Sequence, residues 1–220
     1  MQNTEDKTKR ILNNLISVRE DLWDLNDDIW HNLDHSSIEQ VQNATKFQIE
    51  YLRLIDLFAK TSDEIAALIS QFAGIKDDNP EISPSDNERI IIELDKNEPH
   101  YLTEDFTYKK PFAIVIENFA YKNLENWKAL YKQICKHLAN KNLELFDSLS
   151  VNQELISKMN RKYFSYEKTE LRSPTRITEK TYVETNLSAN DFKKRIQELF
   201  SIFNLQTNDL IIYLRQDRNA

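Results

Sequence analysis

The stretch ILNNLISVREDLWDLNDDI, residues 11–29, decides the fold of the first third of the chain. Its apolar residues recur at alternating intervals of four and three, the spacing that packs one helix along another. They are Ile11, Leu15, Val18, Leu22, Leu25 and Ile29. A second apolar row lies one residue over and consists of Leu12, Ile16, Trp23 and Trp30. We expect a helix from about Thr4 to about Leu33, with an apolar face wider than a two-stranded seam requires.

Residues 37–73 continue this rhythm and predict a second long helix. Ser37 followed by Gln40 is typical of a capped start, and a kink near Thr61 is compatible with the pattern. The only glycine, Gly74, lies where the pattern stops, as is common just past a helix end. Two such helices form an antiparallel hairpin. Further apolar residues, Phe47, Leu54, Leu57 and Leu68, would face water, so we expect the second half or another copy of the chain to cover them.

Charge divides the chain into an acidic and a mildly basic part. Residues 1–75 carry 7 Lys+Arg against 13 Asp+Glu, residues 76–110 carry 5 against 10, and residues 111–220 carry 17 against 13. The net charge of −7 argues against a protein that coats nucleic acid over its whole surface, although a local basic patch stays open. We expect a helical hairpin in 1–74, a linker in 75–88 and an α+β domain in 89–220.

Composition also indicates the cellular compartment of the protein. Cys135 is the only cysteine, which excludes an intramolecular disulfide and a cysteine-rich zinc site. The first ten residues, MQNTEDKTKR, contain no apolar segment, and no apolar run approaches the roughly 20 residues that cross a bilayer. We therefore expect a cytoplasmic protein that does not span a membrane.

The second half predicts short strands alternating with helices. A helix over 124–137 should be capped by Asn123, and Ser188 with Asp191 should start another. A β-hairpin is predicted over 112–122. The remaining strand candidates are 89–95, 162–165, 171–177, 182–185 and 209–215.

Two of these segments repeat one pattern. Residues 112–138 and 176–203 each read as strand, turn, strand, polar cap and helix, with Trp127 and Phe192 at matching places. The sequence therefore predicts an α+β fold in which two ββα units share one mixed sheet behind the helical hairpin.

Four segments of this half resemble a known module. They are Tyr163–Ser165, Leu171–Ile177, Tyr182–Asn190 and Leu210–Arg215. Together they look like a poorly characterised C-terminal module of bacterial proteins associated with restriction and anti-phage genes. The resemblance covers about half of the chain, implies a role in bacterial defence or mobile-element biology, and supplies no catalytic residues.

The best candidate binding segment runs from residue 158 to residue 182. It interleaves basic and aromatic side chains, the combination that neutralises and stacks single-stranded nucleic acid or a phosphorylated ligand. The predicted ligand-binding residues are Lys162, Tyr163, Arg172, Arg176 and Tyr182. Three glutamates dilute the segment, so a solvated hairpin with core aromatics and a protein-binding surface are the alternatives.

No catalytic or metal-binding pattern is strong. Cys135 has no assignable base, and His31 with His35 has no third ligand. Glu93 and Asp95 would share one face of a strand, where they form a carboxylate pair or a solvated edge. The acidic residues Asp24, Asp27, Asp28 and Asp34 are expected on a solvated face, and His100 and His137 at the surface or core edge.

We therefore expect a non-enzymatic, cytoplasmic, defence-type protein without metal or cofactor. Its helical half should build a homo-oligomer or dock a partner. Its α+β half should recognise a nucleic acid, a phosphorylated ligand or a protein. The alternative is a metal-dependent nuclease component of a restriction-like system, with a site assembled from residues remote in sequence.

Overall fold

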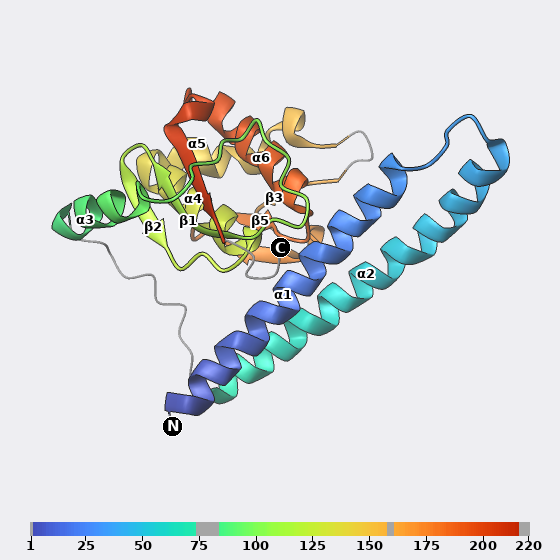
Figure 1. Ribbon diagram of the computed structural model, residues 1–220, viewed down its shortest axis with the longest axis horizontal. Coiled ribbons are helices and arrows are strands. Elements are labelled where there is room, and N and C mark those ends of the chain that lie inside the picture. The colour runs from blue at the N-terminus through green and yellow to red at the C-terminus, as the bar shows by residue number, and fades with distance from the viewer. Residues whose placement is uncertain (1, 74–83, 158–160, 216–220) are drawn as a thin grey trace.

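The computed structural model describes residues 2–73, 84–157 and 161–215. Its first two helices, α1 (Gln2–His31) and α2 (Ile38–Ala73), form the predicted antiparallel hairpin (Figure 1). The Ser37 hydroxyl accepts a hydrogen bond from the backbone N–H of Gln40 at 3.3 Å, as the capping pattern predicts. α2 is continuous through Thr61. Gly74, the predicted end signal, lies outside the described residues, and so does most of the predicted linker.

The α+β class is confirmed, and the sheets are arranged in two sets of three. One sheet has the order β2 (Phe119–Lys122), β1 (Pro111–Ile116), β6 (Leu210–Leu214). The other has the order β3 (Phe164–Ser165), β5 (Tyr182–Glu184), β4 (Pro174–Arg176). All the pairings are antiparallel. The prediction of one mixed sheet is therefore wrong. The central strands are β1 and β5, and each has its second neighbour in β6 or β3 instead of in a strand of the other ββα unit.

The two ββα units share a core instead of a sheet. β1 and β2 lead into α4 (Trp127–Lys141), and β4 and β5 lead into α6 (Ala189–Ile202). Trp127 and Phe192 are both fully buried in the larger apolar core, at the predicted places. The other helical segments of this half are α5 (Leu143–Ser148), η1 (Leu149–Val151), η2 (Gln153–Leu155), η3 (Lys168–Glu170) and η4 (Thr207–Asp209).

Residues 89–95 do not form the predicted strand. Residues 89–94 belong to helix α3 (Pro84–Leu94), which also replaces the end of the predicted linker, and Asp95 lies in the turn that follows. A helix turns Ile90, Ile91 and Leu94 toward the outer face of the first sheet, where they pack in a second, smaller apolar cluster. Ile92 points away and is exposed. The Asn87 amide bonds the backbone of β2, accepting from Ala120 N–H and donating to the Asn118 carbonyl oxygen, both at 2.7 Å. α3 thus covers a strand edge that would otherwise be unpaired.

One helix cap also differs from the prediction. The side chain of Asn126, not Asn123, accepts from the Ala129 N–H at 2.8 Å and starts α4. Asn123 has a φ of 62° and ends the β-hairpin in the left-handed region that asparagine tolerates. At α6 the predicted cap is confirmed, because the Ser188 hydroxyl accepts from the Asp191 N–H at 3.2 Å.

Candidate functional site

The three predicted ligand-binding cations already have partners within the chain. Lys162 forms an ion pair with Glu170 at 2.6 Å, and Arg172 forms one with Asp56 of α2 at 3.2 Å. Arg176 donates to the carbonyl oxygens of Thr178 and Glu179 at 3.1 and 2.7 Å. A phosphate at these positions would have to compete with those partners.

The two predicted aromatic residues occupy different environments. Tyr163 is buried, and the guanidinium groups of Arg195 and Arg161 lie 4.1 and 5.2 Å from its ring centroid. Such cation–π contacts make it a packing residue. Tyr182 is half-buried and lines a hollow of about 460 Å³ together with Tyr166, Glu179 and Lys180.

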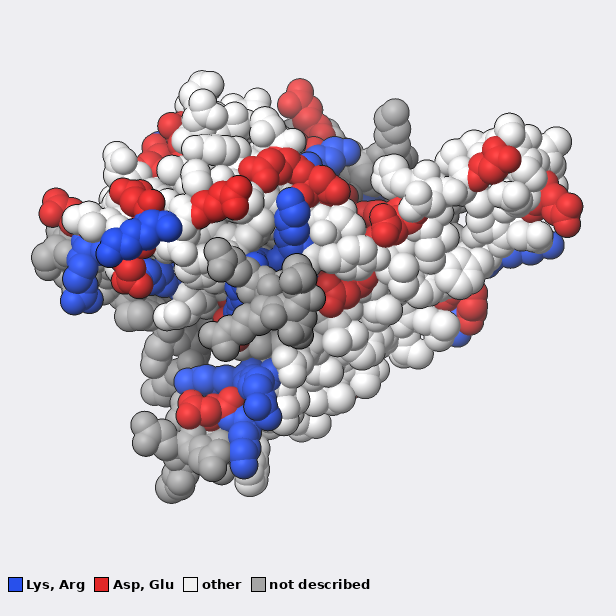
Figure 2. Space-filling model, in the orientation of Figure 1, with Lys and Arg blue, Asp and Glu red and all other residues white. Residues whose placement is uncertain are grey.

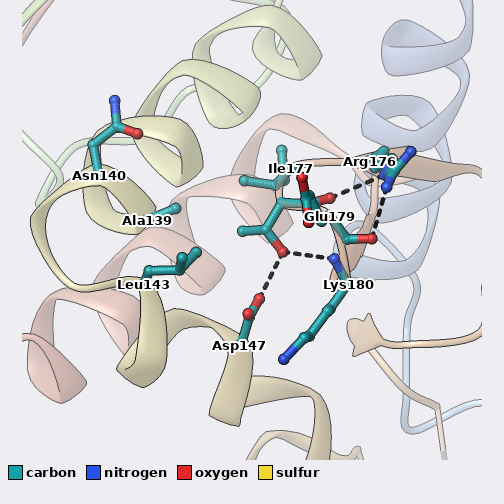
Figure 3. A pocket seen from close by; sticks show the side chains of 9 residues that line it. Ala139, Asn140, Leu143, Asp147, Arg176, Ile177, Glu179 and Lys180 are labelled. Atoms are coloured by element: carbon teal, nitrogen blue, oxygen red, sulfur yellow. Dashed lines mark hydrogen bonds between the residues drawn. The ribbon is translucent and has the colours of Figure 1, made fainter.

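A larger groove adjoins this hollow, with Glu179 and Lys180 lining both (Figure 3). It encloses about 840 Å³ and is lined by Ala139, Asn140, Leu143, Asp147, Arg176, Ile177, Thr178, Glu179 and Lys180. Asp147 accepts from the hydroxyls of Thr178 and Thr181 at 2.6 and 2.7 Å, which fixes the 178–181 turn against α5. Arg176 and Tyr182 are therefore brought to adjoining hollows, whereas Lys162, Tyr163 and Arg172 are not lining residues of either.

Sequence reasoning missed the polar face of α1 that docks on the α+β half. Glu20 accepts from the Lys128 N–H at 2.9 Å, at the N-terminus of α4. One turn later Asp24 accepts from the Ala189 N–H at 3.0 Å, at the N-terminus of α6, and from the Tyr108 N–H at 2.8 Å. Each carboxylate thus meets the positive end of one repeated helix. The expectation of a solvated face is wrong for Asp24, which is 2% exposed.

Burial perturbs the protonation of this interface. It raises the pKa of Glu20 to about 7, although Lys110 and the backbone N–H groups of the α4 N-terminus oppose the change. It also raises the pKa of Asp24 to about 6, against the hydrogen bonds from Tyr108 and Ala189. The Glu20 Oε2 atom is buried without a hydrogen-bond partner among the described residues, and the Lys110 ammonium lies 3.7 Å from it.

Further polar contacts complete the docking. Arg19 is almost fully buried and contacts Asp63 of α2 and the Ser173 hydroxyl, both at 3.3 Å. The Trp23 indole N–H donates to the Asn186 side chain at 2.7 Å. Among the described residues, neither apolar core cluster contains a residue of the hairpin, although Trp23 is itself buried. Hydrogen bonds and ion pairs therefore join the hairpin to the α+β half alongside the packing of Trp23.

The side of α2 that faces away from the α+β half is apolar and exposed. Leu54, Leu57, Ile65, Leu68 and Phe72 are between 40% and 96% exposed. At about 100° per residue they fall within a strip of about 80°, with Thr61 at its centre. The residues that α2 buries, Ile55, Ala59 and Ser62, lie on the other side. We call these five apolar residues and Thr61 the outer stripe.

The neighbouring helix α1 also exposes apolar side chains. On α1, Ile11, Val18 and Leu25 are 40% to 49% exposed and lie at intervals of seven. Figure 2 shows a long stretch of hairpin surface without charged side chains. Apolar surface of this extent is typical of an interaction site.

The residues considered for catalysis do not form a site. No group of three or more His, Cys, Asp or Glu suited to a metal occurs among the described residues. Cys135 is buried, which raises the pKa of its thiol far above the usual range. Glu93 lies on helix α3 and pairs with Lys122, so the predicted strand pair with Asp95 is wrong. The histidine at 137 is held between Glu117 and the Tyr121 hydroxyl, each at 3.1 Å.

None of the described helices is both long and apolar enough to cross a bilayer.

No family model, curated protein or solved structure matches the chain.

Proposed function

We propose that this chain is a non-enzymatic bacterial defence-type protein that self-associates through the outer face of its helical hairpin and binds a partner through its α+β half. The outer stripe carries the proposal, because its apolar side chains remain exposed although the hairpin is already docked on the rest of the chain. The defence role rests on the resemblance of the C-terminal segments alone.

For the ligand of the α+β half, the geometry favours a protein segment over nucleic acid. Lys162, Arg172 and Arg176 are engaged within the chain, so a phosphate at these three positions would have to displace their present partners. The groove offers Leu143 and Ile177 beside the Lys180 ammonium, a mixture that suits a peptide with an acidic group.

The outer stripe also provides a matched test. Leu68 and Ile49 are both 67% exposed on α2, but Ile49 lies about 120° round the helix from the centre of the stripe. In sedimentation velocity of the full chain, Leu68→Gln should shift the boundary toward the monomer, whereas Ile49→Gln should leave it unchanged. Equal effects of the two variants would show that the stripe is not the assembly surface.

The nuclease alternative is tested with labelled DNA and RNA, with and without magnesium. We expect neither cleavage nor salt-sensitive binding. Magnesium-dependent cleavage would establish the alternative.

For the defence role, bacteria that express the chain should lose phage protection when Leu68→Gln is introduced and keep it with Ile49→Gln.

A further inference from the structure

The central part of the outer stripe has the same residue spacing in both directions. Its central members, Leu54, Leu57, Thr61, Ile65 and Leu68, are separated by three, four, four and three residues. Reversing the helix about Thr61 therefore places Leu54 on the position of Leu68 and Leu57 on that of Ile65. Two copies related by a two-fold axis at Thr61 therefore bring apolar side chains against apolar side chains along this part of the stripe.

Resting on the proposed self-association, we infer that the partner of the outer stripe is a second copy of this chain, with the two α2 helices antiparallel and crossing at Thr61. In this register Leu54 contacts Leu68 of the second copy, and Leu57 contacts Ile65 of the second copy. Thr61 meets its own equivalent on the two-fold axis. Its side chain is smaller than those of its neighbours, so the helices can approach closely there.

Charge beside the stripe supports the antiparallel orientation. Lys60 and Glu64 are exposed and lie on the same flank of α2, about 40° apart around the helix. In an antiparallel pair the same flanks of both copies face each other, so Lys60 lies within reach of Glu64 of the second copy. The two-fold axis repeats this contact, which gives two complementary pairs around Thr61.

The length of the stripe is sufficient for a helical interface. The part that the two copies share, from Leu54 to Leu68, covers about 21 Å at 1.5 Å per residue. In this register the two helices bury their apolar rows against each other over several turns. On α2 the α+β half contacts Asp56 and Asp63, which lie on the side of the helix away from the outer stripe.

Single cysteines test the orientation in the otherwise intact full chain. Cys135 is fully buried, so it does not compete for oxidation in the folded protein. Under mild oxidation, Thr61→Cys should form a disulfide-linked dimer. Leu54→Cys mixed with Leu68→Cys should form a cross-linked pair, whereas Leu68→Cys alone should not, because its two copies would lie about 21 Å apart along the axis. Ile49→Cys is the control and should stay uncross-linked.

The outcomes separate this inference from the proposed function. Cross-linking of Leu68→Cys with itself, without the mixed product, would show a parallel pair. It would overturn the antiparallel register while self-association stands. A dimer in sedimentation without any of these cross-links would place the interface elsewhere and overturn the inference as well. A monomer at all concentrations would overturn both.

Discussion

Replacing Glu20 by Gln should stabilise the protein at neutral and higher pH. The folded protein binds a proton at Glu20 more tightly than the unfolded chain, because burial raises the pKa from 4.5 to about 7. The protonated side chain therefore favours the fold below pH 4.5, and this contribution is lost as the pH rises through about 7. A shift of this size corresponds to about 3 kcal/mol. Glutamine has no ionised form, so it avoids that loss.

Glutamine keeps one contact of the carboxylate and changes the other. Its amide oxygen can accept from the Lys128 N–H as the Oε1 atom does, whereas its NH₂ group replaces the Oε2 atom and places a donor on the side of the Lys110 ammonium, 3.7 Å away. The groups that oppose the pKa shift are Lys110 on the Oε2 side, Arg19 on α1 and the N-terminus of helix α4. The variant and the parent should thus be similar near pH 4.5 and diverge toward pH 8.

Urea unfolding at several pH values measures the difference. The free energy of unfolding of Glu20→Gln minus that of the parent should grow by about 3 kcal/mol between pH 4.5 and pH 8. Glu39→Gln, an exposed glutamate on α2, is the control and should stay within about 0.5 kcal/mol at every pH. A difference that does not change with pH, or that falls as the pH rises, would refute the assignment of Glu20 as a buried carboxylate with a raised pKa.

Three more predictions follow from particular contacts. Truncating Trp127 or Phe192 to Ala should each lower the free energy of unfolding by about 3–5 kcal/mol in urea titrations, since both rings are fully buried; a loss below 1 kcal/mol would contradict the shared core. Lys60→Glu should weaken self-association roughly tenfold, and combining it with Glu64→Lys should restore it, if two pairs of about 0.7 kcal/mol act across the interface; no recovery in sedimentation equilibrium would exclude those pairs. Cys135 should react with iodoacetamide only after unfolding, and stoichiometric labelling of the native protein at pH 8 would contradict its burial.

The parts of the fold that could be predicted depend on local patterns. The 3–4 spacing in α1 and α2, the Glu117–Asn118 turn of the β-hairpin and the Ser188 cap are each encoded within a few neighbouring residues. Both turn residues have positive φ, 47° and 69°, the conformation of a tight hairpin turn. The strand prediction for residues 89–95 was wrong because three consecutive isoleucines fit a strand or a buried helix equally well. Only their packing on a sheet that is distant in sequence decides between the two structures.

The polar docking of α1 could not be predicted for the same reason. Glu20 and Asp24 bond residues more than a hundred positions away, and their spacing along the helix also suits a solvated face. The one signal was Trp23 between them, an aromatic residue outside the main apolar row. Its burial requires a second neighbour for α1, and that neighbour brings the carboxylates to the helix N-termini.

Sedimentation equilibrium of the full chain tests the central proposal, assembly through the outer face of the hairpin. The chain mass is 26.1 kDa, so at tens of micromolar we expect a mass of at least twice that value. Leu68→Gln should return it toward the single-chain mass. A parent protein that remains at 26.1 kDa over the whole concentration range would contradict the proposal.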